Sequence, residues 1–310
     1  MLFRQLEYFV AVAQERHFAR AAEKCYVSQP ALSSAIAKLE RELNVTLINR
    51  GHSFEGLTPE GERLVLWAKR ILAEHDAFKA EVRAMRSGIT GTLRLGTVPT
   101  ASTTASLFLS AFCAAHPLAK VQILSRLAAT ELYRRVREFE LDAAIVHTSP
   151  DEAREVDLVP LYEERYVLLS PADMVPSGAT TLTWPQAAQL PLALLTPDMR
   201  DRQLIDEAFA GHAIAVTPHV ETDSVASLLA QVATGNWACI VPHTWLWTSP
   251  LNADIRAVEM VDPVVRAEIA LATNSAGPGS PIARALTASA QELALDEFFD
   301  AQLPGLRHRR

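Results

Sequence analysis

The polar residues whose types and spacing could support a specific chemistry form two sets, and the first follows Ser28. Ser28 is a good N-cap for a helix, and Pro30 would be tolerated in the first turn, where its missing N–H group costs little. Leu32, Ile36 and Leu39 then recur at helical spacing and predict a buried face. The opposite face would present small and polar residues. These are Gln29, Pro30, Ser33, Ser34, Lys38 and Arg41.

Such a face fits the major groove of DNA. Small side chains let a helix approach the base edges closely, and the Gln29 amide can pair with adenine through two hydrogen bonds. Lys38 and Arg41 lie farther along the helix, where cations suit phosphate contacts that fix the register without reading the sequence. Arg20 on the preceding helix and Arg50 in a following hairpin would add positive charge. The alternative interpretation is an ordinary amphipathic helix with a solvated polar face.

The second set consists of polar groups that follow predicted strands or begin predicted helices. Segment 97–104 ends a strand and opens a helix, so its backbone N–H groups, helix dipole and hydroxyls could bind an anion. Thr100 and Ser102 are the foremost candidates for ligand contact, with Thr103 beside them. Other residues could converge on the same crevice from other strand ends. They are Thr130, His147, Thr148, Thr196 and Thr222. Ser and Thr also cap helices without a ligand, and that alternative stays open.

No other pattern predicts a metal, cofactor or catalytic site. The histidines lack metal-ligand spacing, so no metal is expected. Cys25, Cys113 and Cys239 are widely spaced, contain no CxxC pair, and are interpreted as small hydrophobic residues. The chain also lacks GxSxG, HExxH and dinucleotide-binding motifs. We therefore expect no enzyme and no cofactor, although α/β domains host many reactions and an enzyme is the competing class. An adaptor protein would leave the pattern after Ser28 without a use.

The first set requires a small helical domain to position it. Apolar stripes at helical spacing cover 4–14 and 18–25, before the helix that starts after Ser28. Residues 47–58 predict a short β-hairpin. Three helices and a hairpin within residues 1–58 predict a winged helix-turn-helix.

A long helix is expected next, over 59–88. Thr58, Pro59 and Glu60 form a strong helix start, and Gly88 marks the end. Its apolar positions step alternately by four and three residues, which predicts a dimerisation coiled coil. The seam consists of Leu64, Ala68, Ile71, His75, Phe78, Val82 and Met85.

From Gly91 onward, short apolar runs alternate with helical patterns, which indicates α/β units with mostly parallel sheets. Strands are predicted over 93–95, 121–124, 143–146, 166–169, 192–195, 238–241 and 269–272. Helices are predicted over 104–115, 130–139, 201–210 and 224–234.

Composition is consistent with two or three compact units. The chain has 310 residues, 49% of them hydrophobic, and a net charge of −7. Residues 1–58 carry seven Lys/Arg against six Glu, so the acidity belongs to the C-terminal part and DNA affinity must come from local placement of cations. The N-terminus has no secretion-signal pattern and no apolar run is long enough to span a bilayer, so a cytoplasmic location is expected.

The longer pattern closely resembles the LysR-type transcriptional regulators. The resemblance is carried by residues 6–13, 18–23, 27–33, 36, 39–40, 43–47 and 57–61. It continues less specifically in 91–96, 116–117 and 141–146, so that it covers nearly the whole chain. It implies that Gln29, Pro30 and Ser33 lie at the DNA-facing start of the recognition helix. This chain departs from the family pattern at two places that bear on particular base contacts. Relatives often carry an arginine after the second serine-type position of this helix, where this chain has Ser34-Ala35, and the wing 51–56, usually rich in arginine, has none here.

The resemblance also implies a two-lobed effector domain like the periplasmic binding proteins, over 91–300. Lobe I would take 91–164 and 266–300, and lobe II 165–265. The expected function is sequence-specific DNA-binding regulation, switched by a small molecule, a small carboxylate or anion, held between the lobes. The expected partners are double-stranded DNA, a second copy or three further copies of the chain, and RNA polymerase, with no membrane.

Overall fold

The computed structural model describes the chain except for residues 51–53, 150, 249–253, 302 and 304–310. Contacts divide it into two compact units. Unit 1 contains Met1–Ile89 with two short segments, 138–140 and 277–281, and unit 2 contains most of the remainder.

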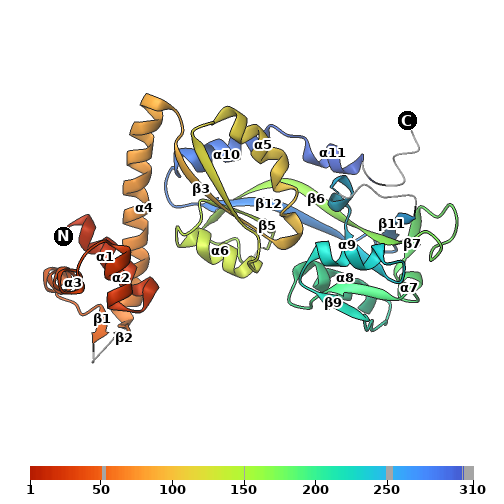
Figure 1. The fold of residues 1–310 in the computed structure, drawn as a ribbon, viewed down its shortest axis with the longest axis horizontal. Helices are drawn as coiled ribbons and strands as arrows, with labels where there is room; N and C mark the ends of the chain where they lie inside the picture. The colour runs from red at the N-terminus through yellow and green to blue at the C-terminus, as the bar shows by residue number, and fades with distance from the viewer. Residues whose placement is uncertain (51–53, 150, 249–253, 302, 304–310) are drawn as a thin grey trace. The chain divides into compact units, whose positions relative to one another are not determined.

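Unit 1 is a helical domain followed by one long helix (Figure 1). Its elements are α1 (Phe3–Glu15), α2 (Phe18–Lys24), α3 (Gln29–Leu43), β1 (Ile48–Arg50), β2 (Phe54–Leu57) and α4 (Pro59–Ser87). Phe9, Val12, Ile36 and Leu39 lie in one core that all four helices share. Strands β1 and β2 pair antiparallel as the hairpin. The predicted winged helix-turn-helix is confirmed, although the wing turn 51–53 lies outside the described residues.

Two helix starts form as the sequence predicts. The Ser28 side chain accepts a hydrogen bond from the Ala31 N–H, and the Thr58 hydroxyl accepts one from the Gly61 N–H at 2.9 Å. The Thr58 hydroxyl also donates to the Thr46 carbonyl at 2.7 Å, which ties α4 to the hairpin. A Cβ atom at Gly61 would lie 2.1 Å from the Leu47 carbonyl oxygen, so only glycine permits this approach.

The predicted heptad seam of α4 divides into two parts. Ala68 is buried, and Leu64 and Ile71 pack against the core of the same unit. Phe78, Val82 and Met85 remain exposed, on the half of α4 that extends beyond α1–α3 (Figure 1). The first half of the seam therefore serves the domain's own core, and the second half is available to a partner helix.

Unit 2 is an α/β domain with two lobes. The first lobe contains β3 (Gly91–Thr97), η1 (Pro99–Ala101), α5 (Ala105–Ala115), β4 (Ala119–Leu124), α6 (Ala129–Arg137), β5 (Ala143–His147), β12 (Arg266–Asn274), α10 (Pro281–Gln291) and α11 (Leu295–Asp300). The second contains β7 (Thr181–Thr183), α7 (Trp184–Ala187), β8 (Leu192–Leu195), α8 (Arg200–Ala210), β9 (Val220–Thr222), α9 (Val225–Ala233), β10 (Ala238–Pro242), η2 (His243–Trp247) and β11 (Ile255–Val261).

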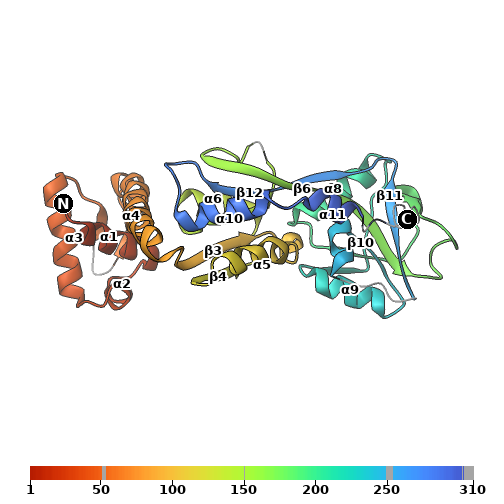
Figure 2. The same ribbon diagram turned by 90° about the horizontal axis from the view of Figure 1, so that it is seen from above.

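A single long strand, β6 (Val156–Pro171), belongs to both lobes (Figure 2). Its first part pairs antiparallel with β12, up to Arg165 opposite Arg266. Its second part pairs with β10 and β11, beginning at Tyr166 opposite Pro242. Strands β3, β4 and β5 pair parallel in one lobe, and β8, β9 and β10 in the other. The predicted α/β class with a two-lobed effector domain is confirmed.

The sequence missed some of these strands. It predicted only 166–169 of β6, because Pro160 and charged residues interrupt the apolar pattern before that point. Pro160 lies where the register of β6 shifts against β12, a position that tolerates a residue without an N–H group. Strands β7, β9 and β11 were also not predicted. None of the helices in the described part of the chain is both long enough and apolar enough to cross a membrane.

Candidate DNA-binding face and interlobe site

The predicted DNA-reading face lies on α3, and its polar side chains are accessible. Leu32, Ile36 and Leu39 are fully buried, which turns the opposite side of the helix toward solvent. Gln29, Pro30, Ser34, Lys38 and Arg41 are exposed there, and Ser33 is half-buried. The buried face that the sequence predicts for α3 is therefore confirmed.

Of the cationic side chains proposed to contact DNA, Arg20 and Arg41 already donate hydrogen bonds to backbone carbonyls. The Arg20 guanidinium donates to the Glu15 carbonyl at 2.8 Å, and the Arg41 Nε donates to the Ala37 carbonyl at 3.3 Å. Both side chains therefore already have backbone partners within the chain. Arg50 is the last residue of β1, and its side chain lies outside the described part of the chain, as does the rest of the wing turn.

Tyr26 is an exposed aromatic residue that the sequence analysis did not single out. It lies in the turn between α2 and α3, is 95% exposed, and has a left-handed backbone with φ of 56°. Its position in the turn just before α3 is the sequence feature that could have marked it as a residue near the DNA-reading face.

Thr100 is the predicted effector residue with the clearest role in the structure. It lies in η1 after β3 and is fully buried. Its hydroxyl donates to Oδ2 of Asp201 at 2.9 Å, and its carbonyl accepts from Nε1 of Trp245 at 2.8 Å. Both partners belong to the second lobe, so Thr100 joins the two lobes directly.

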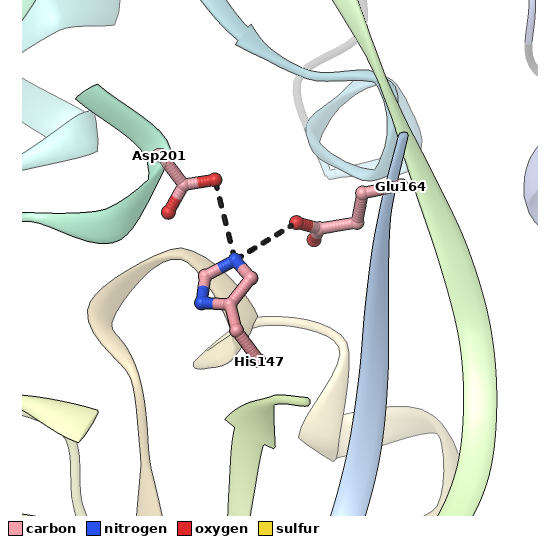
Figure 3. A group of neighbouring side chains, drawn as sticks. All are labelled: His147, Glu164 and Asp201. Atoms are coloured by element: carbon pink, nitrogen blue, oxygen red, sulfur yellow. Dashed lines mark ion pairs between the residues drawn. The ribbon is translucent and has the colours of Figure 1, made fainter. Parts of the chain in front are cut away.

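His147 joins the lobes as well. It ends β5, and its Nε2 atom lies 3.5 Å from Oδ1 of Asp201 and 3.6 Å from Oε2 of Glu164. Figure 3 shows this ring nitrogen facing both carboxylates. Asp201 comes from the first turn of α8, and Glu164 lies where β6 passes from one lobe to the other. We call these three residues the interlobe triad.

The interlobe triad is almost completely buried, and its charges are strongly coupled. His147 is 6% exposed, Asp201 2% and Glu164 0%. Burial lowers the pKa of His147, but the charges of Asp201 and Glu164 outweigh it and raise that pKa to about 10. Burial raises the pKa of Glu164. Burial also opposes ionisation of Asp201, yet the charge of His147 and hydrogen bonds from Tyr166 and Thr100 bring its pKa below the usual range.

The remaining predicted effector residues are only partly gathered. Thr196 and Thr222 are neighbours, because the Thr196 N–H donates to the Thr222 carbonyl at 3.1 Å. The Ser102 hydroxyl donates a hydrogen bond to the Pro99 carbonyl. Thr130 is exposed on α6, and Thr148 is half-buried after β5. Within the described residues, neither of the last two shares a hydrogen bond with the interlobe triad.

Several buried polar atoms at or near the junction of the lobes have no hydrogen-bond partner among the described residues. They are Oγ1 of Thr97, Thr103 and Thr196, both ring nitrogens of His147, and Oε2 of Glu164. Thr97 ends β3, His147 ends β5, and Thr196 follows β8. Buried polar atoms are normally paired, so these are the groups that a bound polar ligand or water would satisfy.

Part of segment 97–104 has its backbone N–H groups paired within the chain. The sequence suggested free backbone N–H groups for an anion, but the N–H groups of Ala101 and Ser102 donate to Val98 and Pro99 within the turn. Those of Ser106 and Leu107 donate within the first turn of α5. The sequence did not predict the two buried carboxylates here: Asp201 accepts a hydrogen bond from Thr100, and Glu164 lies beside His147. No local motif marks them, because residues 164 and 201 meet only in the folded domain.

Comparison with known proteins identifies two family matches. Residues 3–62 match the bacterial regulatory helix-turn-helix proteins of the lysR family, and residues 86–294 match the LysR substrate binding domain. Together these matches cover most of the chain.

Two of the similar proteins are peroxide-inducible activators by name. A probable hydrogen peroxide-inducible genes activator from Streptomyces viridosporus is 31% identical over 296 residues, which is 94% of each chain. A hydrogen peroxide-inducible genes activator from Haemophilus influenzae is 29% identical over 292 residues, covering 91% of this chain and 92% of that protein.

Solved structures show the same fold. A full-length OxyR variant from Pseudomonas aeruginosa is 28% identical, with a TM-score of 0.75, over 94% of this chain and 98% of that one. Full-length CbnR in complex with its target DNA is 22% identical, with a TM-score of 0.62, over 94% of this chain and 99% of that one.

Proposed function

Because this chain belongs to the LysR family of bacterial transcription regulators, we propose that α3 reads its operator and that a ligand between the two lobes controls this activity. The family consists of non-enzymatic DNA-binding regulators, which removes the enzyme alternative. A role on the chromosome also supports a cytoplasmic location.

The observation that carries the DNA-reading proposal is the polar face of α3. Gln29 and Pro30 are exposed at the N-terminal end of the helix, where residues of a recognition helix contact base edges. Lys38 and Arg41 are exposed farther along, in positions that suit phosphate contacts. Ser33, Ser34, Arg20 and Arg50 complete the proposed contact set.

The test is a gel shift with DNA from upstream of the protein's own gene, with variants compared at matched salt. Gln29→Ala should weaken specific binding by on the order of 1–3 kcal/mol, because it removes a two-hydrogen-bond base contact. Ser33→Arg should abolish binding, because a long side chain would hold the helix away from the bases. Gln14→Ala, which changes an exposed glutamine on α1, is the matched control. Unchanged affinity of Gln29→Ala and Ser33→Arg would mean that another surface reads the DNA.

The ligand proposal rests on the unpartnered polar atoms at the strand ends. Thr97, Thr103, His147 and Thr196 contribute buried donors or acceptors from both lobes. A polar ligand that satisfied them would bind the closed arrangement more tightly than the open one. It would thereby shift the regulator between states, because only differential affinity can move such an equilibrium.

For the chemical class of that ligand we propose a cation or a hydrogen-bond donor in place of the small anion that the sequence suggests. An anion beside Thr100 would meet the buried carboxylates of Asp201 and Glu164, and like charges at close range in a buried site repel strongly. The geometry supports a ligand that is cationic or that donates hydrogen bonds to these carboxylates.

Calorimetry against a panel of small anions, aromatic acids and amines tests the ligand class. Thr100→Val keeps the shape of the side chain but removes the hydroxyl, and should weaken effector binding by about 1–3 kcal/mol. Operator binding without effector should survive. If a small carboxylate bound wild type and Thr100→Val equally, the effector would be an anion and Thr100 would not contact it.

The names of the similar proteins raise peroxide sensing as a second candidate. A redox-sensing cysteine needs access and thiolate character. Cys239 is fully buried, and this burial raises its pKa to about 12; burial also raises the pKa of Cys25. Cys113 is exposed on α5. These environments leave Cys113 as the most accessible thiol for such a role among the described cysteines, since Cys25 is half-buried.

The proposed assembly uses α4. LysR regulators are typically tetramers, and the exposed seam residues Phe78, Val82 and Met85 support pairing of two α4 helices. Pairing of effector domains would build the tetramer, and RNA polymerase is the proposed partner through which DNA binding changes transcription.

A further inference from the structure

We infer that the interlobe triad, His147, Glu164 and Asp201, is a binding site for one divalent transition-metal ion that joins the two lobes. The inference deepens the proposed ligand site by naming a cation for it, and the ion binding itself can be tested without DNA. Figure 3 shows the three side chains converging from β5, β6 and α8.

The distances favour a shared ion over direct hydrogen bonds. Nε2 of His147 lies 3.5 Å from Asp201 Oδ1 and 3.6 Å from Glu164 Oε2. Charge-assisted N–H···O bonds are about 2.7–2.9 Å long, so neither contact has the length of one. Two ligand atoms that are each about 2.0–2.2 Å from a tetrahedral ion lie roughly 3.3–3.6 Å apart, which matches these two separations. Ligand atoms of all three residues lie within 4.8 Å of one another.

The charges favour a divalent ion. With both carboxylates ionised, the triad carries a net charge of −1 even when the ring is protonated. A neutral ring, two carboxylates and a divalent cation sum to zero, which removes the cost of burying an unbalanced charge. Glu164 Oε2 and His147 Nε2, which face each other, have no hydrogen-bond partner within the described part of the chain.

Hydrogen bonds already hold the ligand groups in place. Asp201 Oδ2 accepts from the Thr100 hydroxyl at 2.9 Å, and Oδ1 accepts from the Tyr166 hydroxyl at 2.9 Å. Glu164 Oε1 accepts from the Thr244 hydroxyl at 3.2 Å, which leaves Oε2 directed at His147. The Tyr133 hydroxyl fixes the His147 carbonyl at 2.9 Å. Such supporting contacts are what orient the ligands in known metal sites.

The donor set also selects the kind of ion. An imidazole nitrogen with two carboxylate oxygens suits Zn²⁺, Mn²⁺ or Fe²⁺ better than Mg²⁺ or Ca²⁺, which prefer oxygen ligands alone. All three ligand residues are almost completely buried, which favours a single ion over a larger organic cation. Because the ligands come from both lobes, an ion bound there would favour the closed arrangement.

The experiment measures Zn²⁺ and Mn²⁺ bound to the full-length protein after chelator treatment, by equilibrium dialysis and elemental analysis. Wild type should bind one more equivalent than Glu164→Gln or His147→Gln. Ions bound by exposed cysteine or histidine elsewhere contribute equally to wild type and variants, so they cancel in this comparison. Glu163→Gln is the matched control, because Glu163 is the adjacent carboxylate on β6 but is exposed and pairs with Arg266. It should bind as wild type does. Thr100→Val should weaken binding about 10–100-fold, as loss of a supporting contact does.

Thermal melts separate a lost site from a lost fold. With chelator present, Glu164→Gln should melt at or above the wild-type temperature, because it removes a buried carboxylate charge and retains the Thr244 bond. Adding Mn²⁺ should raise the wild-type melting temperature and leave Glu164→Gln unchanged. Equal ion content in wild type and Glu164→Gln, or binding of Mg²⁺ as tightly as Zn²⁺, would overturn the inference. A protein that binds the ion but shows no ion-dependent DNA binding would retain the site and contradict only its regulatory role.

Discussion

At the scale of single residues, burial decides what Cys239 and His243 can do. Cys239 lies inside β10 and His243 begins η2, and both are fully buried. Their chemistry is set by the strands around them, so residue type alone gives a poor guide to reactivity.

We expect Cys239 to be unreactive in the native protein. Its pKa is raised to about 12 by burial, so the thiolate that reacts with alkylating agents or peroxide is nearly absent at neutral pH. Iodoacetamide labelling followed by mass spectrometry should modify the exposed Cys113 first and Cys239 only after unfolding. Labelling of both residues at similar rates would contradict this environment.

We expect His243 to make the protein less stable as the pH falls from about 6.5 to about 4. Burial and the charge of Arg165 lower its pKa to about 4, while Asp300 and Glu163 oppose them. The unfolded chain therefore binds a proton before the folded chain does, and the free energy of unfolding falls by up to about 3 kcal/mol across this range.

Urea unfolding of wild type and His243→Asn at several pH values measures this contribution. The difference in stability between the two proteins should change between pH 7 and pH 4.5. A constant difference would show that His243 is not held neutral.

At the scale of elements, α4 has two functions along its length. Its first half completes the core of unit 1 through Val65 and Ala68, and its second half carries exposed apolar residues in heptad spacing. A substitution at Ile71 would therefore disturb the domain's own packing, whereas Phe78 and Met85 lie clear of it.

Phe78→Glu combined with Met85→Glu should dissociate the dimer. Each change would bury an unpaired charge at the seam, which costs about 3 kcal/mol or more. Light scattering should report the monomer mass, with circular dichroism unchanged. Leu66→Glu alters another exposed apolar residue of α4, outside the seam, and should leave the mass as in wild type. If the double variant kept the wild-type mass, α4 would not be the dimer contact.

At the scale of the whole effector domain, a few buried contacts hold the lobes together. The Trp245 indole N–H donates to the Thr100 carbonyl, and the Thr100 hydroxyl donates to Asp201. These contacts join segments that are 145 and 101 residues apart in sequence. They are the contacts that must break when the domain opens.

Trp245→Phe should shift the domain toward a more open arrangement. It removes the indole donor and leaves the Thr100 carbonyl without that partner, at a cost of about 1–3 kcal/mol. Small-angle scattering should give a larger radius of gyration than wild type. Trp247→Phe is the control, because the Trp247 indole N–H has no hydrogen-bond partner among the described residues. Equal radii for Trp245→Phe and wild type would show that this bond does not restrain the lobes.

The sequence by itself determined the features that depend on local pattern. The caps at Ser28 and Thr58, the buried face of α3 and the alternation of strands and helices after Gly91 are all set by residues a few positions apart. Periodicity and capping are local physics, and they were sufficient to predict the helix-turn-helix and the α/β class.

Only the tertiary structure decided the character of the interlobe site. His147, Glu164 and Asp201 come from β5, β6 and α8, and no spacing in the sequence relates them. The sequence suggests an anion site from hydroxyl groups alone, because the carboxylates of Glu164 and Asp201 approach His147 only in the folded domain. Likewise, the partition of the α4 seam follows from which residues the three-helix core covers. Both outcomes depend on long-range packing, which a local pattern does not encode.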